Sequence, residues 1–389
     1  MSKNRSLPTG WSSRSGPRIL ASAIAALFAS GETLALPVGP AVVNGTASIA
    51  QVGNALTINN SAGAILNWQK FSIGADELVR FNQPSAASSV LNRVLAADPS
   101  VIYGQLSSNG KVWLVNTAGV LVGAGAKIDT AGFVASTLGI SNSDFLAGKL
   151  NFKADGSAGS VINQGEITTP LGGNIYLIGS QVTNQGLITT PQGETILAAG
   201  ATVSLIDTAT PGVKVDITGA EGNVTNLGQI TAEAGRIGMA GVLVRNSGQL
   251  NASSVVNQGG RIFLKASQDV TVDGPGHVFA SGDMAGGSIE VSSEGTTIVR
   301  GRLDATAEHG HGGEIDIFGD KVGLFDHAQL DASGSFGGGT IRIGGDYQGA
   351  NPEVRNASFT YVGQGTTIRA NSGKVSAGGT AEVTQKMKA

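Results

Sequence analysis

Cysteine is absent from this sequence, so disulfide bonds do not stabilise the fold. Charge is also scarce, since Asp, Glu, Lys and Arg make up 14% of the chain, against roughly 25% in an average soluble domain. The formal net charge of −3 provides no attraction to nucleic acid or to an anionic membrane, and neither is expected as a partner. Beyond the N-terminal segment, no stretch approaches the ~18 apolar residues of a membrane-spanning helix, so we expect no membrane span.

Glycine, in contrast, is abundant. It occupies 59 of the 389 positions, about twice its usual share of ~7%. There is no Gly-X-Y period, which excludes collagen. Many Gly, Ser, Thr, Asn and Val residues with little charge predict an extended β protein whose surface is made of small polar side chains.

Residues 1–35 have the features of a secretory signal peptide. Basic side chains precede a short apolar run at residues 19–29, and small residues follow it. The basic residues are Lys3, Arg5, Arg14 and Arg18. A run of 11 residues is too short for a stable membrane anchor and fits a cleaved signal, with a buried N-terminal helix as the alternative. We predict cleavage between Ala35 and Leu36, and therefore a secreted mature chain.

A short phrase, Asn-x-Gly flanked by apolar residues, recurs in the middle of the chain. Its asparagines are Asn163, Asn184, Asn226 and Asn246, at successive intervals of 21, 42 and 20 in the sequence. We interpret the interval of 42 as two coils of 21. A period near 20 with strand-forming residues and glycine-bearing turns predicts a β-solenoid. Asn and Gly tolerate left-handed conformations, which suits a coil corner, and asparagines repeated in register can form a hydrogen-bonded ladder.

A second repeated feature, a Gly followed two residues later by Ile, indicates that the coils lengthen. Its last four isoleucines, Ile262, Ile289, Ile315 and Ile341, follow one another at intervals of 27, 26 and 26. We therefore expect β-helix repeats over residues 156–349, with about 21 and then about 26 residues per coil. Period-2 alternation predicts that Ile315 and Ile317 point inward and that Glu314 and Asp316 point outward.

The remaining segments repeat less regularly. Large aromatic side chains concentrate in residues 36–155, and we expect them to close the first end of the solenoid. Residues 88–97, bracketed by prolines, are the one candidate for a short helix, with a loop as the alternative. Residues 350–389 read as an irregular tail, with a strand near residues 366–370. This tail is compatible with a cap on the last coil and with the cut end of a longer array of repeats.

Several motifs resemble the secretion domain of the filamentous haemagglutinin family, the exoproteins of two-partner secretion. They are residues 67–74 (NWQKFSIG), 81–84 (FNQP), 91–94 (LNRV), 102–106 (IYGQL), 109–116 (NGKVWLVN) and 135–146 (ASTLGISNSDFL). Residues 330–334 (LDASG) and 344–349 (GGDYQG) resemble repeats of larger members. The resemblance implies an all-β fold, a right-handed parallel β-helix with an N-terminal cap, in which residues 36–155 form the secretion domain.

The resemblance also implies a function. Members of the family are exported from Gram-negative bacteria through the periplasm and a dedicated outer-membrane β-barrel transporter. The transporter's periplasmic domains recognise the N-terminal domain, a role that would extend here to about residue 250. Recognition residues carried over from the motifs are Asn67, Trp68, Phe71, Asn82, Pro84, Asn92, Arg93, Asn116, Gly119 and Val120. The family commonly has Asn-Pro-Asn-Gly-Ile where this chain has residues 116–120, NTAGV.

We therefore expect a non-enzymatic surface or extracellular adhesin that contacts a host or surface receptor and needs no cofactor. A carbohydrate-active β-helix enzyme is one alternative, for which Asp304 and Asp331, one coil apart, are the candidate carboxylates. A truncated contact-dependent toxin or haemolysin is another. His309 and His311 with nearby acidic residues read as a solvated turn rather than a metal site, and the calcium-binding nonapeptide repeat is absent.

Overall fold

The computed structural model describes residues 36–156, 159–208, 212–352, 354–373 and 380–383. The predicted signal peptide, including Ala35, lies outside these residues. Leu36, the residue after the predicted cleavage point, is described and is buried against the first coils.

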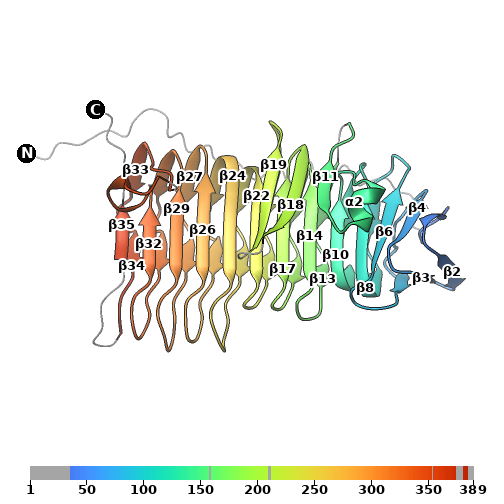
Figure 1. Ribbon diagram of the computed structural model, residues 1–389, viewed down its shortest axis with the longest axis horizontal. Coiled ribbons are helices and arrows are strands. Elements are labelled where there is room, and N and C mark those ends of the chain that lie inside the picture. The colour runs from blue at the N-terminus through green and yellow to red at the C-terminus, as the bar shows by residue number, and fades with distance from the viewer. Residues whose placement is uncertain (1–35, 157–158, 209–211, 353, 374–379, 384–389) are drawn as a thin grey trace, which may run out of the picture. The chain divides into compact units, whose positions relative to one another are not determined.

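Parallel strands stack coil upon coil along the described chain (Figure 1), and each coil contributes strands to three faces. The first face contains β1 (Ala41–Asn44), β4 (Ala64–Trp68), β6 (Ser89–Val94), the ends of β8 (Gln105–Val115) and β10 (Lys127–Ser136), β14 (Asn174–Gly179), β17 (Glu194–Ala199), the starts of β22 (Arg236–Asn246) and β24 (Arg261–Val272), β26 (Ser288–Ser293), β29 (Glu314–Phe318), β32 (Thr340–Ile343) and β35 (Thr380–Val383).

The other two faces run beside it. The second face contains β7 (Ser100–Ile102), β9 (Val120–Val122), β12 (Ser160–Asn163), β15 (Gln181–Asn184), β20 (Asn223–Asn226), the ends of β22 and β24, β27 (Thr296–Val299), β30 (Lys321–Leu324) and β33 (Phe359–Val362). The third face contains β2 (Ala47–Val52), β3 (Ala55–Asn60), β5 (Leu78–Asn82), the starts of β8 and β10, β13 (Glu166–Thr168), β16 (Leu187–Thr189), β21 (Gln229–Thr231), β23 (Gln249–Asn251), β25 (His277–Phe279), β28 (Arg302–Asp304), β31 (Gln329–Asp331) and β34 (Thr367–Arg369).

One continuous apolar core fills the coils, as the alternation predicts. Ile315 and Ile317 are fully buried, and each such side chain stabilises the fold by about 1.5–3 kcal/mol before entropy is counted. Asp316 between them is also largely covered, because Arg342 of the next coil lies over it and donates to its carboxylate at 2.7 and 2.6 Å. The predicted parallel β-helix is therefore confirmed.

Antiparallel pairs close the N-terminal end of the core. Strand β1 pairs antiparallel with β4, and β2 forms a hairpin with β3. Partly buried Ala47 and Ile49 of β2 pack against the core. The large aromatics do not all close this end, contrary to the expectation, because Trp113, Phe145 and Phe152 pack in a second cluster outside the coils.

The predicted helix at residues 88–97 is wrong, since this segment contains strand β6. Parallel partners lie on both sides of it, β4 and β8, and a helix there would leave both strands without their hydrogen bonds. The short helix α2 (Asn142–Leu146) lies elsewhere and was not predicted. Ser141 caps it, with its hydroxyl accepting from the Asp144 backbone N–H at 3.0 Å.

The 42-residue interval between Asn184 and Asn226 is one coil, not two. Strand β15 pairs directly with β20, and the additional residues form a hairpin, β18 (Thr202–Thr208) and β19 (Gly212–Thr218). With β11 (Leu150–Lys153) this hairpin makes a three-stranded antiparallel side sheet on the first face (Figure 1). The side sheet covers the second apolar cluster, which includes Trp113, Phe152, Tyr176, Val203 and Leu205.

The later coils follow the predicted period and continue past residue 349. Ser288 aligns with Glu314 and Glu314 with Thr340, so these coils keep the spacing of their buried isoleucines. After a 3-10 turn, η1 (Tyr347–Gly349), β33, β34 and β35 pair with the preceding coil. The prediction of an irregular tail is therefore wrong for these strands, while the strand expected near residues 366–370 is present as β34.

The repeated glycines are required by contact and not by left-handed geometry. Those of the Asn-x-Gly phrase, Gly165, Gly186, Gly228 and Gly248, do not belong to the positive-φ positions. A Cβ added to Gly186 would lie 2.1 Å from the carbonyl oxygen of Gly165, and one added to Gly228 would lie 2.2 Å from that of Gly186. Any larger residue would push neighbouring coils apart, so a steric explanation replaces the conformational one.

Candidate secretion block and surface sites

A buried hydrogen-bonded chain crosses the first coils of the predicted secretion block. The Trp68 indole N–H donates to Asn92 Oδ1 at 2.9 Å, and Asn92 Nδ2 approaches the Trp113 carbonyl oxygen at 3.4 Å. Trp68 and Asn92 are fully buried. These residues join adjacent coils through polar contacts that have no access to water, so they specify register as well as stability.

Arg93 joins the coils to the segment that follows β10. Its guanidinium donates from Nη2 to the Ile140 carbonyl oxygen and to Asn142 Oδ1, both at 2.9 Å, and Nη1 lies 3.5 Å from Asn67 Oδ1. Burial lowers the pKa of Arg93 from its usual value. Helix α2 is thereby held against the first face, where Phe145 meets the Trp113 ring edge-on at a centroid distance of 5.1 Å.

The turn at residues 116–120 forms without the proline of the family pattern. Buried Asn116 donates to the Asp98 carbonyl oxygen and to Ser100 Oγ, both at 3.0 Å, and its own Oδ1 accepts from the Ala118 N–H at 3.0 Å. Gly119 has a φ of 141°, a value that side-chain-bearing residues rarely adopt. Asn116 and Gly119 therefore build the turn, and Val120 begins the buried strand β9.

Most of the predicted recognition residues lie in the interior. Trp68, Phe71, Asn92, Asn116, Gly119 and Val120 are buried, Asn67 and Arg93 are half-buried, and Asn82 and Pro84 are exposed. Asn82 also bonds Asn59 of the previous coil, Nδ2 to Oδ1, at 2.9 Å. The folded surface thus presents only Asn82 and Pro84 of this set fully to a partner.

The expected asparagine ladder is present on the second face. Asn163 donates to Asn184, Asn184 to Asn226 and Asn226 to Asn246, each from Nδ2 to Oδ1 at 2.8 Å. All four side chains are fully buried. The ladder occupies four coils, and valines fill the same position on either side, at Val122 and Val272. It is therefore a structural element of the core.

A cleft of about 660 Å³ lies beside the side sheet. Its lining includes Lys111, Lys149, Tyr176, Glu194, Leu205 and Arg236. Glu194 accepts from the Tyr176 hydroxyl at 2.7 Å and lies 3.1 Å from Arg236 Nε. Among the lining residues that the structure describes, Glu194 is the one carboxylate, so this cleft does not hold the carboxylate pair that a glycosidase uses.

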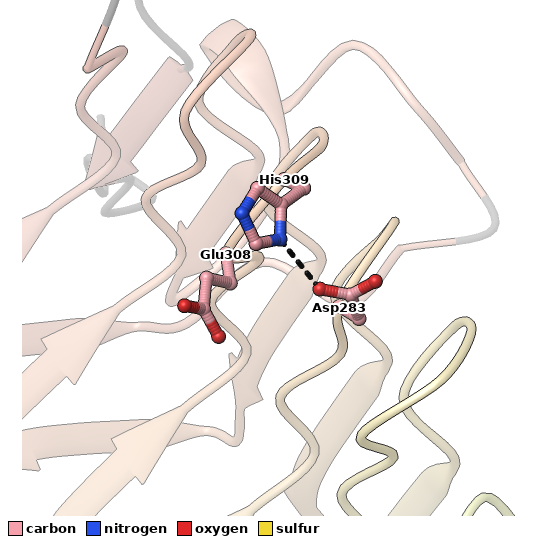
Figure 2. Close-up of side chains that lie close together, drawn as sticks. All are labelled: Asp283, Glu308 and His309. Carbon is pink, nitrogen blue, oxygen red and sulfur yellow. Dashed lines mark hydrogen bonds and ion pairs between the residues drawn. The ribbon is translucent and has the colours of Figure 1, made fainter.

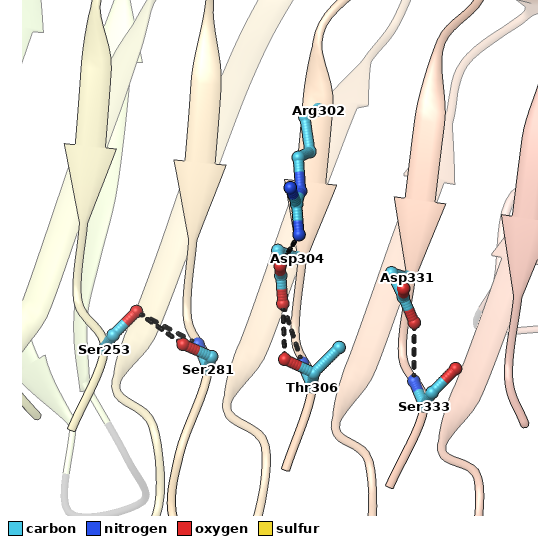
Figure 3. A network of polar contacts seen from close by, with 7 residues as sticks. All are labelled: Ser253, Ser281, Arg302, Asp304, Thr306, Asp331 and Ser333. Atoms are coloured by element: carbon cyan, nitrogen blue, oxygen red, sulfur yellow. Dashed lines mark hydrogen bonds and ion pairs between the residues drawn. The ribbon is translucent and has the colours of Figure 1, made fainter. Parts of the chain in front are cut away.

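The candidate carboxylates of the enzyme alternative have turn-forming roles (Figure 3). Asp304 and Asp331 align in adjacent coils, as predicted. Asp304 accepts from the Thr306 N–H at 3.1 Å and hydroxyl at 2.7 Å, and pairs with Arg302 at 2.5 Å. Asp331 accepts from the Ser333 N–H at 3.0 Å. Each carboxylate starts a long loop, and neither lines the cleft beside the side sheet.

Across the described ranges, none of the helices is long and apolar enough to span a membrane.

The fold and its buried motifs define the chain as a capped parallel β-helix with a side sheet. Sequence comparison then places it more closely. The model of the TPS secretion domain matches residues 35–279, and the chain belongs to this family. The match continues far beyond the boundary at residue 155 that we predicted.

Two curated relatives align with a part of the chain. A heme/hemopexin-binding protein of Haemophilus influenzae (strain ATCC 51907 / DSM 11121 / KW20 / Rd) is 40% identical over 120 residues, 31% of this chain and 13% of the relative. A second protein of the same description from Haemophilus influenzae is 42% identical over 74 residues, 19% of this chain and 8% of the relative. The chain thus spans only a small part of either relative's length.

Two solved structures cover more of the chain. The HMW1 secretion domain from Haemophilus influenzae superposes with a TM-score of 0.71 and 34% identity, covering 87% of this chain and 84% of that one. The filamentous hemagglutinin secretion domain has a TM-score of 0.40 and 19% identity, covering 70% of this chain and 96% of that one. The similarity to HMW1 includes the coils beyond the predicted secretion block.

Proposed function

We propose that this protein is an exoprotein of two-partner secretion whose N-terminal coils are recognised by a cognate outer-membrane transporter. The observation that carries the proposal is the family match over residues 35–279. The extensive similarity to the HMW1 secretion domain supports it. The mature protein would reach the outside of a Gram-negative cell through the periplasm.

The burial of the motif residues determines when recognition can occur. Trp68, Asn92 and Asn116 contact a transporter only while the chain is unfolded, because in the folded coils they are covered and hydrogen bonded within the protein. Folding outside the cell would withdraw them from the transporter. The same residues would first bind the transporter and then stabilise the folded coils. Because folding uses the same contacts that binding needs, folding would favour release from the transporter.

An adhesive role is the second part of the proposal. The coils beyond the secretion block present a long array of small polar side chains, which suits contact with a carbohydrate or protein receptor. The relatives named above are heme/hemopexin-binding proteins, but the aligned segment is 13% of the first of them. The likeness supports shared export and does not extend to a shared ligand. The turn-forming roles of Asp304 and Asp331 support a non-enzymatic function.

Two measurements test the export proposal. Periplasmic domains of the cognate transporter should bind chain freshly diluted from urea and should bind the folded protein at least about tenfold more weakly. In cells carrying the transporter, Asn116→Ala, Gly119→Ala or deletion of residues 67–120 should leave the protein in the periplasm. Leu303→Ala, which disturbs the fully buried core beyond the matched residues 35–279, is the control for lost stability. Unchanged release of the Asn116 and Gly119 variants, or release impaired equally by the control, would contradict recognition by this block.

A further inference from the structure

The long loops that connect the third face to the first are stacked as regularly as the strands. Ala285 bridges to His311 and His311 to Gly337, while Gly282 bridges to Ala307 in parallel fashion. These loops form the lower edge of the coils in Figure 1. A residue in one loop therefore has a fixed neighbour in the next, even though a whole coil of sequence separates the two.

Two of these loops bring three metal-ligating side chains together (Figure 2). Asp283 comes from one loop, and Glu308 and His309 come from the next. His309 Nδ1 lies 2.7 Å from Asp283 Oδ1, and one ligand atom from each of the three residues lies within 4.8 Å of the others. No other such group of three is found among the residues that the structure describes.

The backbone holds the two loops in this arrangement. The His309 N–H donates to the Asp283 carbonyl oxygen at 2.7 Å, and the Glu308 N–H donates to that of Gly282 at 3.1 Å. Gly310 follows directly, and a Cβ there would lie 1.5 Å from the Met284 carbonyl oxygen. The loops are thus in contact with no space between them, and the carboxylates and the imidazole extend from a fixed base.

The donor set selects a class of metal. One imidazole nitrogen and two carboxylate oxygens are typical ligands of Zn²⁺, with water as the fourth ligand. Bonds of about 2.0–2.2 Å in a tetrahedron place ligand atoms about 3.3–3.6 Å apart. The His309–Asp283 contact of 2.7 Å would open slightly and the wider separations would close, which rotation of the exposed Glu308 and His309 side chains allows. Calcium prefers six to eight oxygen ligands and suits this set poorly.

We propose that Asp283, Glu308 and His309 bind a Zn²⁺-type transition-metal ion that joins two adjacent coils. A surface ion pair between His309 and Asp283 alone would contribute little, because His309 is 63% exposed and the Asp283 side chain 27%. The metal adds bonds that link neighbouring loops. Because the ligands meet only after the coils have stacked, the site exists in the folded exoprotein and not in the unfolded chain that crosses the membranes.

The test is calorimetric titration of the folded full-length mature protein with zinc chloride at neutral pH. One ion should bind per chain. Asp283→Asn, Glu308→Gln and His309→Gln should each weaken binding at least about tenfold, because each removes one of three ligands. His311→Gln is the matched control, since His311 lies two residues away on the same loop and outside the group. It should change the affinity less than about twofold.

Folding is monitored separately, so that a loss of zinc binding is distinguished from a loss of folding. Far-ultraviolet circular dichroism and melting without metal should be the same for the three ligand variants and the control. Zinc should raise the melting temperature of the wild type and of His311→Gln but not of His309→Gln. Absence of binding, binding that survives His309→Gln, or calcium chloride binding with higher affinity than zinc chloride at the same residues would overturn the proposal.

Discussion

Asn184 donates a 2.8 Å hydrogen bond to Asn226, although 42 residues separate them and the coils on either side have half that interval. The hairpin β18–β19 leaves the coil between them and returns without changing the register. The buried amide ladder thus fixes which coil lies on which, while surface insertions are accommodated outside it. This separation lets one face acquire a side sheet and a cleft without altering the core.

The ladder predicts a specific cost of removing one amide. Asn226→Ala leaves the Asn184 donor and the Asn246 acceptor buried without their partner, and we expect a loss of about 2–4 kcal/mol in the free energy of unfolding. Urea denaturation measures it. The control is Gln164→Ala, which breaks an exposed amide bond to Gln185 of 2.9 Å and should cost less than about 0.5 kcal/mol. Similar losses in both variants would contradict a buried role for the ladder.

Replacing all four ladder asparagines with valine gives a second prediction. Neighbouring coils already have Val122 and Val272 at this position, so the core accepts the shape. Removing donors and acceptors together leaves fewer unpaired groups, and the quadruple variant should lose less stability than the four single variants added together. Urea denaturation of the wild type and the five variants supplies the free energies of unfolding for the comparison. A loss equal to or larger than that total would mean that the amides are individually indispensable.

Steric contact between coils predicts a strong effect at Gly186. The added methyl group of Gly186→Ala would meet the Gly165 carbonyl oxygen at 2.1 Å, and we expect a loss of about 3 kcal/mol or more. Gly274→Ala is the matched control, because nothing lies within 4 Å of the position that its methyl group would take and its φ is not positive. Thermal melting of the two variants separates contact from conformation. Equal melting temperatures would show that the coils can separate at no cost.

The coil period was predictable from sequence because stacking imposes the same demand on each coil. Isoleucines of the long coils had to be buried at the same position in each coil, and amides had to align, so both are visible as repeats. The strand at β6 was not predictable, since its apolar spacing also fits one helical face and the partners that decide, β4 and β8, are distant in sequence. The side sheet left no periodic signal, because a single insertion does not repeat.

The candidate sites show the same limit. Trp68, Asn92 and Asn116 stood out as motif residues, yet their burial and mutual contacts depend on how coils stack. The grouping of Asp283 with His309 depends on loop register and has no local motif. The sequence therefore indicated which residues belong to a motif, but not which residues contact one another across the coils.

The Trp68–Asn92 bond predicts non-additive mutational effects. Trp68→Phe keeps an aromatic ring but leaves the buried Asn92 Oδ1 without its 2.9 Å donor, and we expect a loss of about 1–3 kcal/mol beyond that of the smaller ring. Adding Asn92→Leu to this variant removes the unpaired oxygen and should cost less than the two single losses combined. A double-mutant cycle by urea denaturation measures the coupling. Strict additivity would mean that the contact is energetically neutral.

Asp316 predicts how stability depends on pH. Burial raises the pKa of Asp316, and this outweighs the opposing effect of its hydrogen bond to Arg342. The folded state therefore retains a proton that the unfolded state, with an Asp pKa of about 3.9, has already released. Between these two pKa values the folded state binds more protons, so this residue's contribution to stability falls as the pH rises through the interval.

Comparison with Asp316→Asn isolates that contribution. The free energy of unfolding of the wild type, minus that of Asp316→Asn, should decrease from about pH 3.5 upward and become constant above the folded-state pKa. Arg342→Met removes the hydrogen bond that lowers the pKa of Asp316. The free energy of unfolding of Arg342→Met, minus that of the double variant Asp316→Asn and Arg342→Met, should therefore decrease more steeply with pH. Urea denaturation between pH 3.5 and 7 supplies both curves. A difference that increases with pH would mean that attraction to Arg342 dominates over burial, and that the pair stabilises the coils as an ordinary salt bridge.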